Sequence, residues 1–216
     1  MPSRAPVRPR SRAPRKPAGR YHHGDLRNAL LQAAVATIDR EGVDALTLRG
    51  VGETLGVSRT ALYRHFRDKT SLLEAVAAQG FRTLRADLTT AWESGGAGVA
   101  AFTAMGRAYV RFAVTHPSHY RVMFGAFRPE GACDDDLKAA GAGAFQALVD
   151  ALAAQQSAGT IRRDPLPTQA RYVWAVVHGV AMLAIDRQLG QDPAAGNALA
   201  DYAVEALVTG LEARLL

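Results

Sequence analysis

The chain has 216 residues, a net charge of +6 at pH 7, 48% hydrophobic residues and a single cysteine. This length provides for a real core, in one large or two small domains. The lone Cys133 excludes an internal disulfide, and no segment reaches the roughly eighteen apolar residues of a membrane span, so we expect a cytoplasmic protein without a membrane-spanning segment.

The positive charge is concentrated in residues 1–20, which hold seven lysines and arginines and no acid. Residues 21–216 therefore sum to −1. Five prolines in the same stretch oppose helix formation, so we predict a disordered basic arm. Such an arm is expected to reach a DNA backbone or a narrow minor groove. A solubilising tail without a specific role is the alternative.

The stretch that follows Thr47 has the pattern of two short helices joined by a tight turn. Val51 and Leu55 are four residues apart and share one helix face. Gly56 favours the left-handed conformation that ends a helix, and Ser58 is a good N-cap for the next one. Val57, between them, is expected to fill the corner.

The second helix of this pair is predicted to run from about Arg59 to Phe66. Leu62 and Phe66 are four apart and are expected to point inward. The other face carries a polar stripe without an acid, made of Thr60, Tyr63, Arg64 and Arg67. Such a stripe offers hydroxyls, guanidinium groups and one aromatic ring to the DNA major groove. An ordinary helical hairpin with solvated charges is the alternative.

The residues after this helix favour the DNA-binding interpretation. Asp68 can cap a further helix, which places Lys69 in the first turn of that helix. A lysine there opposes the helix dipole and is easier to understand if it meets a phosphate.

The segment from Leu55 to Leu73 resembles the DNA-binding signature of the TetR family of bacterial repressors. The similarity begins upstream, at residues 30–34, Ile38 and residues 41–42, which resemble the first helix of the family. The resemblance implies an all-α homodimer. Each subunit would have a helix-turn-helix domain over residues 21–68 and a larger effector-binding and dimerisation domain over residues 69–216.

The same resemblance implies roles for particular residues. Phosphate contacts are expected at Thr47, Tyr63, His65 and Lys69, and base or backbone contacts at Ser58, Arg59 and Thr60, beside Arg64 of the polar stripe. The chain departs from the family pattern at Gly50 and Gly52. Each glycine costs a helix about 1 kcal/mol relative to alanine, so this helix is expected to depend on packing.

Abundant alanine, few aromatic residues and the absence of long alternating runs predict helices in the rest of the chain. The expected helices cover residues 69–94, 99–115, 118–124, 134–157, 168–190 and 193–216. Residues 134–136 are three consecutive aspartates, interpreted as an N-terminal cap because acids there complement the helix dipole. A metal site at these aspartates is a weaker alternative.

The segment from Tyr172 to Ile185 resembles the Trp-His-Gly motif of one C-terminal subtype of the TetR family, through Trp174, His178 and Gly179. This resemblance implies that the last two helices form a four-helix dimer interface with their partners. Whether Trp174 and His178 face a ligand or only the core stays open at this stage.

An apolar effector pocket is expected among the large residues of the central helices: Tyr109, Phe112, Met123, Phe124, Phe145, Trp174 and His178. No catalytic or phosphate-binding motif is present, so neither catalysis nor a cofactor or metal is expected. The sequence predicts a ligand-responsive repressor that binds a palindromic double-stranded DNA operator as a homodimer and is released by a small-molecule effector. The alternative is a ligand-binding or protein-interaction module without sequence-specific DNA binding.

Overall fold

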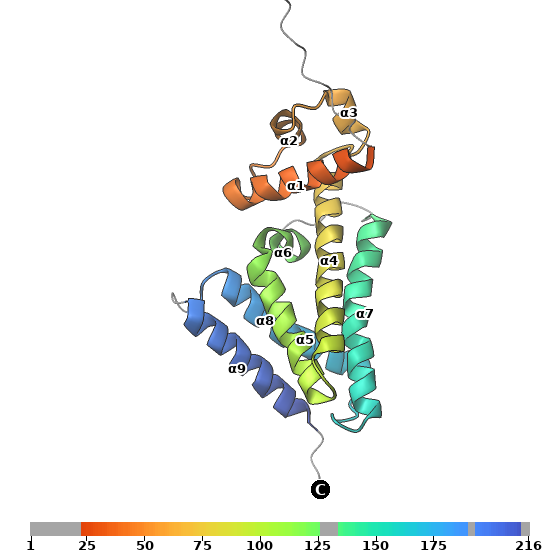
Figure 1. Cartoon of the computed structure of the whole chain (residues 1–216), viewed down its shortest axis with the longest axis vertical. Coiled ribbons are helices and arrows are strands. Elements are labelled where there is room, and N and C mark those ends of the chain that lie inside the picture. The colour runs from red at the N-terminus through yellow and green to blue at the C-terminus, as the bar shows by residue number, and fades with distance from the viewer. Residues whose placement is uncertain (1–22, 126–133, 190–192, 213–216) are drawn as a thin grey trace, which may run out of the picture.

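The computed structural model describes residues 23–125, 134–189 and 193–212 (Figure 1). The predicted basic arm and Cys133 lie outside the described residues. The described part is helical and contains no strand, which confirms the all-α prediction. Its helices are α1 (His23–Glu41), α2 (Leu48–Thr54), α3 (Arg59–Tyr63), α4 (Lys69–Ser94), α5 (Val99–Thr115), α6 (Pro117–Phe124), α7 (Asp135–Ser157), α8 (Leu166–Ile185) and α9 (Pro193–Leu211).

The predicted bounds of α4 and α5 are confirmed, whereas three helices end earlier than predicted. α3 ends at Tyr63 instead of Phe66, and α9 ends at Leu211 instead of Leu216. The prediction that α8 continues to Gly190 was also wrong, because Arg187 adopts a φ of 56° and closes a turn. A left-handed residue cannot continue a right-handed helix.

Two hydrophobic cores are stacked along the molecule, and α4 belongs to both. Its first half places Leu72, Leu73 and Val76 in the core formed by α1–α3. Its second half places Leu84 and Leu88 in the core formed with α5, α7, α8 and α9. Figure 1 shows α4 running from the α1–α3 end down into the larger helical body. Any tilt of α4 therefore acts on both cores.

α6 makes a second connection between the two parts. Ser118 of α6 hydrogen-bonds to the carboxylate of Asp39 on α1, and Val122 packs in the α1–α3 core. α6 also crosses α4 closely, since a Cβ at Gly80 would lie 2.5 Å from the sulfur of Met123. A larger residue at position 80 would therefore require the Met123 side chain to move.

α9 covers the outer side of α5. The guanidinium of Arg107 on α5 pairs with Asp201 at 3.0 Å and with Glu205 at 2.5 Å, both on α9. These ion pairs occupy the guanidinium of Arg107 inside the protein. Over the described residues, no helix is long and apolar enough to cross a membrane.

Candidate DNA-binding surface and effector cavity

The turn between α2 and α3 has the geometry that its residues predict. Thr47 caps α2, with its hydroxyl accepting from the backbone N–H of Gly50 at 3.0 Å. Gly56 has a φ of 64°, and the N–H of Val57 returns to the carbonyl of Gly52 at 3.0 Å. These bonds satisfy backbone groups that the end of α2 would otherwise leave unpaired.

Packing explains one of the two glycines of α2. Gly52 is buried, and a Cβ there would lie 3.1 Å from Leu62 and 3.7 Å from Val57. The missing side chain lets α2 and α3 approach closely, which offsets part of the intrinsic helix cost of glycine.

α3 presents its polar side outward from a firmly packed base. The hydroxyl of Ser58 accepts from the N–H of Ala61 at 3.2 Å, as an N-cap should. Leu62 and Phe66 are each only 3% exposed, which confirms their inward direction. Tyr63 is 47% exposed. The guanidinium of Arg59 lies over the Tyr63 ring, 5.5 Å from its centre, and holds both side chains at the surface.

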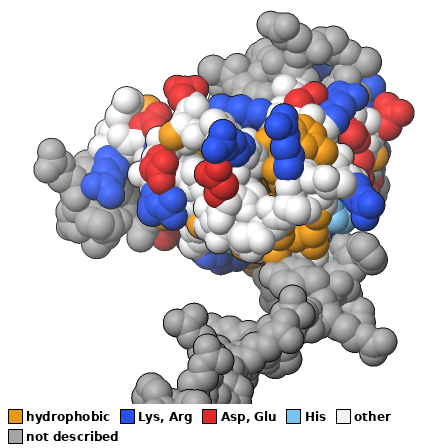
Figure 2. All heavy atoms as spheres, turned by 90° about the horizontal axis from the view of Figure 1, so that it is seen from above, with side chains coloured by type: hydrophobic (Ala, Val, Ile, Leu, Met, Phe, Trp, Pro, Cys, Tyr) orange, Lys and Arg blue, Asp and Glu red, His pale blue; other side chains and the backbone are white. Residues whose placement is uncertain are grey.

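The residues predicted to contact DNA lie together at the α1–α3 end. Six of them are exposed, namely Thr47, Ser58, Arg59, Thr60, Tyr63 and Arg64, while His65 and Lys69 are half-buried. Figure 2 looks onto this end and shows lysine and arginine side chains spread over it, with acidic side chains among them. From Arg59 to Arg67, however, three arginines occur and no acid. The local positive charge is thus strongest along and just after α3.

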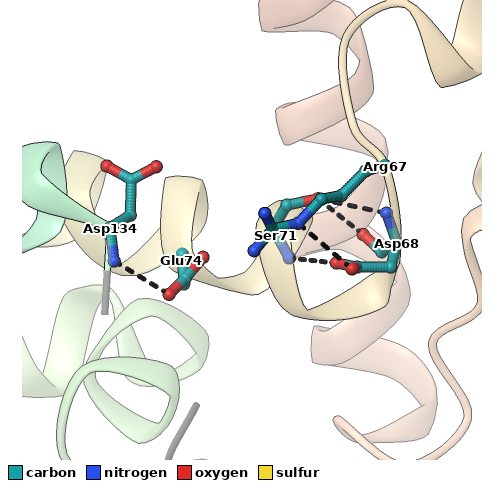
Figure 3. Close-up of polar contacts among 5 residues, drawn as sticks. All are labelled: Arg67, Asp68, Ser71, Glu74 and Asp134. Carbon is teal, nitrogen blue, oxygen red and sulfur yellow. Dashed lines mark hydrogen bonds and ion pairs between the residues drawn. The ribbon is translucent and has the colours of Figure 1, made fainter. Parts of the chain in front are cut away.

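The start of α4 is fixed by a reciprocal capping box (Figure 3). The Asp68 carboxylate accepts from the N–H of Ser71 at 2.7 Å, and the Asp68 N–H donates to the Ser71 hydroxyl at 3.2 Å. The Ser71 backbone bond, with help from Arg67, lowers the pKa of Asp68 below its usual range. The predicted cap is confirmed.

Lys69 has a partner inside the protein that the sequence did not indicate. Its ammonium donates to the backbone carbonyl of Asp44, in the α1–α2 connection, at 3.1 Å. This bond ties the start of α4 to the loop before α2 and gives a second reason for a lysine in the first turn.

A cavity of about 410 Å³ lies in the larger helical body. Side chains of α4, α5, α6, α7, α8 and α9 line it, and nearly all of them are apolar. Four of the predicted pocket residues line it: Tyr109, Phe124, Phe145 and Trp174. The volume lies in the range of pockets that hold small organic molecules.

Three predicted pocket residues do not line the cavity. Phe112 is 1% exposed and stacks on His116, with ring centres 4.9 Å apart. Met123 is committed to the α4–α6 crossing at Gly80. His178 lies behind the wall, bonded to two tyrosines. Residue type identified large apolar side chains but not the direction in which each one points.

Other lining residues were missed by the sequence reasoning. They include Phe81 and Leu84 of α4, Met105 of α5, Arg171 of α8 and Val204 of α9. Arg171 lies three residues before Trp174, so helical spacing from Trp174 was a signal that could have found it.

A polar cluster stiffens the wall behind Tyr109. The Trp174 indole N–H donates to the Tyr109 hydroxyl at 3.2 Å. The Tyr120 hydroxyl lies 3.2 Å from that of Tyr109 and 2.7 Å from Nδ1 of His178. Burial raises the pKa of Tyr109 to about 12, raises that of Tyr120 further and lowers that of His178. In the neutral tautomer of His178 with its proton on Nε2, Nδ1 accepts from the Tyr120 hydroxyl.

The aspartates at the start of α7 act as a cap, as predicted. Asp134 is the N-cap, and its carboxylate accepts from the N–H of Asp136 at 2.7 Å. In the part of the chain that the structure describes, no group of three or more His, Cys, Asp or Glu side chains is placed to hold a metal.

α8 and α9 both carry large apolar side chains that are exposed. Tyr172 and Leu183 of α8 are 53% and 41% exposed, and Leu199 and Tyr202 of α9 are 45% and 68% exposed. At Gly179 of α8, an added Cβ would meet nothing within 4 Å. Large exposed apolar side chains on two neighbouring helices favour a protein interface there.

Two family models match the chain, and together they cover most of it. Residues 30–76 match the model described as bacterial regulatory proteins of the tetR family. Residues 102–207 match the model described as the tetracyclin repressor-like C-terminal domain.

Curated relatives match over different lengths. The tetracycline repressor protein class A of Escherichia coli is 48% identical over 50 residues, which cover 23% of each chain. An uncharacterized HTH-type transcriptional regulator of Mycobacterium tuberculosis is 29% identical over 164 residues, which cover 73% of this chain and 69% of the relative. The match to the tetracycline repressor thus spans less than a quarter of that protein.

Solved structures share the whole fold. A protein of unknown function from Rhodococcus is 34% identical with a TM-score of 0.80, over 90% of this chain and all of the other. The ketosteroid transcriptional regulator of M. tuberculosis has a TM-score of 0.63 at 16% identity, over 88% of this chain and 96% of the other, so it supports the fold alone.

Proposed function

Because the chain belongs to the TetR family of transcriptional regulators, with a helix-turn-helix domain and a C-terminal ligand-binding domain, we propose that it is a repressor. A homodimer binds a palindromic operator, and a small-molecule effector releases it. The observation that carries the proposal is the exposed, acid-free surface of α3 and the residues on either side of it, where Ser58 caps the helix and Arg59, Thr60, Tyr63 and Arg64 are exposed.

In this proposal two groups of residues, in and around α3, have separate tasks. Ser58, Arg59, Thr60 and Arg64 face base edges and nearby backbone in the major groove. Thr47, Tyr63, His65 and Lys69 hold phosphates and so fix the position of α3. The apolar face of Leu62 and Phe66 supports this arrangement, because it anchors the helix in the domain core.

Release by an effector is supported by the position of the cavity. Phe81, Leu84 and Leu88 of α4 line it, and the same helix enters the α1–α3 core with Leu72 and Leu73. A ligand between α4 and α7 therefore acts on a helix that sets the orientation of the DNA-binding domain. The ligand favours release from DNA to the extent that it binds more tightly to the arrangement that cannot bind DNA.

The exposed apolar side chains of α8 and α9 support dimerisation through a four-helix interface. The large ones are Tyr172, Leu183, Leu199 and Tyr202. The assignment to the Trp-His-Gly subtype rests on Trp174, His178 and Gly179. In this proposal Trp174 contacts the ligand, and His178 orients Tyr109 and Tyr120 behind it.

The test is fluorescence anisotropy with DNA from upstream of the protein's own gene, beside a scrambled duplex, at several salt concentrations. We expect a preference of about a thousandfold or more at physiological salt. Equal and steeply salt-dependent binding to both duplexes would instead mean that only non-specific electrostatics operate.

A further inference from the structure

The cavity contains one charged lining residue among the residues that the structure describes. That residue is Arg171 of α8, and no aspartate or glutamate lines the cavity with it. Arg171 is exposed, as is Ala142 of α7, so the two residues mark where the cavity opens between α7 and α8. The deeper walls are aliphatic and aromatic, including Phe102, Val204 and Leu207.

The other polar groups of the cavity wall are already used inside the protein. The indole N–H of Trp174 donates to the Tyr109 hydroxyl, and that hydroxyl also meets Tyr120. These groups therefore require no hydrogen bond from a ligand. Arg171 differs, since no described residue forms a hydrogen bond or ion pair with its guanidinium. Neighbouring arginines such as Arg107 and Arg121 do have acidic partners.

This distribution of polarity matches one kind of molecule. A long apolar body gains free energy by leaving water for the aliphatic interior. An anionic group would lose free energy there, but it can stay at the opening and accept two parallel hydrogen bonds from a guanidinium. Arginine favours a planar carboxylate for this pairing because of its rigid fork of donors.

We propose that the cavity binds an amphipathic monocarboxylate, with its hydrocarbon body among α4, α5, α7 and α9 and its carboxylate on Arg171. The inference rests on the proposed function in taking this cavity as the effector site. It adds the chemical class of the effector and names Arg171 as the residue that selects for charge.

Direct binding to the full chain tests this class without DNA. The chain has two tryptophans, so Trp92→Phe leaves Trp174 in the cavity wall as the only indole reporter. In this background we would titrate decanoate, decanol and decylamine, which share one hydrocarbon tail and differ in the charge of the head group. Arg171→Gln removes the proposed partner. Arg111→Gln removes the same charge from an exposed arginine of α5 that does not line the cavity.

We expect decanoate to bind about tenfold more tightly than decanol, and decylamine to bind most weakly, since a partly exposed ion pair gives a modest preference. Arg171→Gln should abolish the ranking, and Arg111→Gln should keep it. Equal binding of decanoate and decanol, a ranking that survives in Arg171→Gln, or no binding of any probe would each overturn the proposal. Operator binding is measured separately by anisotropy, so a wrong ligand class can be distinguished from a wrong DNA-binding function.

Discussion

The backbone N–H of Asp134 donates to the carboxylate of Glu74 at 3.1 Å, and this bond joins the start of α7 to the upper half of α4 (Figure 3). Glu74 is only 3% exposed, although a glutamate on a helix usually faces water. The bond lies beside the capping box of Asp68 and Ser71, at the level where α4 enters the DNA-binding core. It therefore connects the ligand-binding body to the DNA-binding domain through α7.

Glu74→Leu should lower the free energy of unfolding by about 1–3 kcal/mol, because it leaves the Asp134 N–H without its acceptor in a largely buried place. Glu74→Gln keeps an acceptor oxygen at the same position and should cost less than about 1 kcal/mol. Urea denaturation followed by circular dichroism gives both values. If Glu74→Leu were as stable as the parent, the bond would have no part in holding α7 against α4.

Lys69→Ala should weaken binding to operator and scrambled DNA alike and reduce the salt slope by about one counterion, as expected for a lost phosphate contact. The bond from Lys69 to the Asp44 carbonyl is a competing explanation for this lysine. Thermal unfolding of the same variant separates the two roles. A marked loss of stability with an unchanged salt slope would assign Lys69 to the α1–α2 loop and not to DNA.

Removing residues 1–20 should make DNA binding less dependent on salt, because the segment carries seven positive charges and no negative one. The measurement is the slope of the logarithm of affinity against the logarithm of salt concentration, for the full chain and the truncated one. The matched control is a full-length variant in which the basic residues of this segment are replaced by glutamine, because it removes the charge and keeps the length. An unchanged slope would remove the basic arm from the binding mechanism.

Local signals in the sequence predicted the DNA-binding domain well. A left-handed glycine, an N-cap serine and an N-cap aspartate act within one helical turn, so Gly56, Ser58 and Asp68 revealed their roles without knowledge of the fold. Helical periodicity placed Thr60 and Tyr63 on the outer side of α3, but Arg64 and Arg67 of the predicted polar stripe follow the end of the helix at Tyr63. The predicted DNA contacts themselves remain predictions.

The cavity was harder to predict, because its lining depends on how six helices meet. Tyr109 and Phe112 are three residues apart on α5, yet one lines the cavity and the other packs against His116. The buried position of Glu74 and the exposed side of Tyr202 depend equally on distant partners. Hydrophobicity indicates which residues are buried, whereas the packing of the helices decides which of the buried residues line a cavity.

Tyr202→Glu should convert the proposed dimer to a monomer, since it places a charge at the most exposed apolar position of the α8–α9 face. Operator affinity should fall together with dimerisation, because the two DNA-binding domains that contact the half-sites are then no longer linked. Val114→Glu introduces the same charge at an apolar residue of α5 that is 46% exposed, and it should leave the dimer intact. Sedimentation equilibrium measures the mass of each variant. A dimeric Tyr202→Glu would direct the search to another face.

Acid should destabilise the fold in a window that begins at the ordinary histidine pKa. Burial lowers the folded-state pKa of His178 and of His119 below 6.5. As the pH falls, the unfolded chain therefore takes up these protons first. The free energy of unfolding declines from pH 6.5 down to the folded-state pKa values, and above pH 6.5 these groups contribute no slope.

His178→Asn tests the contribution of the cavity wall to this slope. An asparagine oxygen can replace Nδ1 as the acceptor for the Tyr120 hydroxyl, but it does not titrate. Urea unfolding at several pH values between about 5 and 8 should then show a shallower decline, with the remainder carried by His119. Because Tyr120 bonds to Tyr109, which lines the cavity, protonation of His178 in the folded protein should also weaken ligand binding, as the pH falls through the lowered folded-state pKa of His178. If ligand affinity stayed constant while His178 of the folded parent became protonated, as followed by NMR of its imidazole, then His178 would not control the orientation of Tyr109.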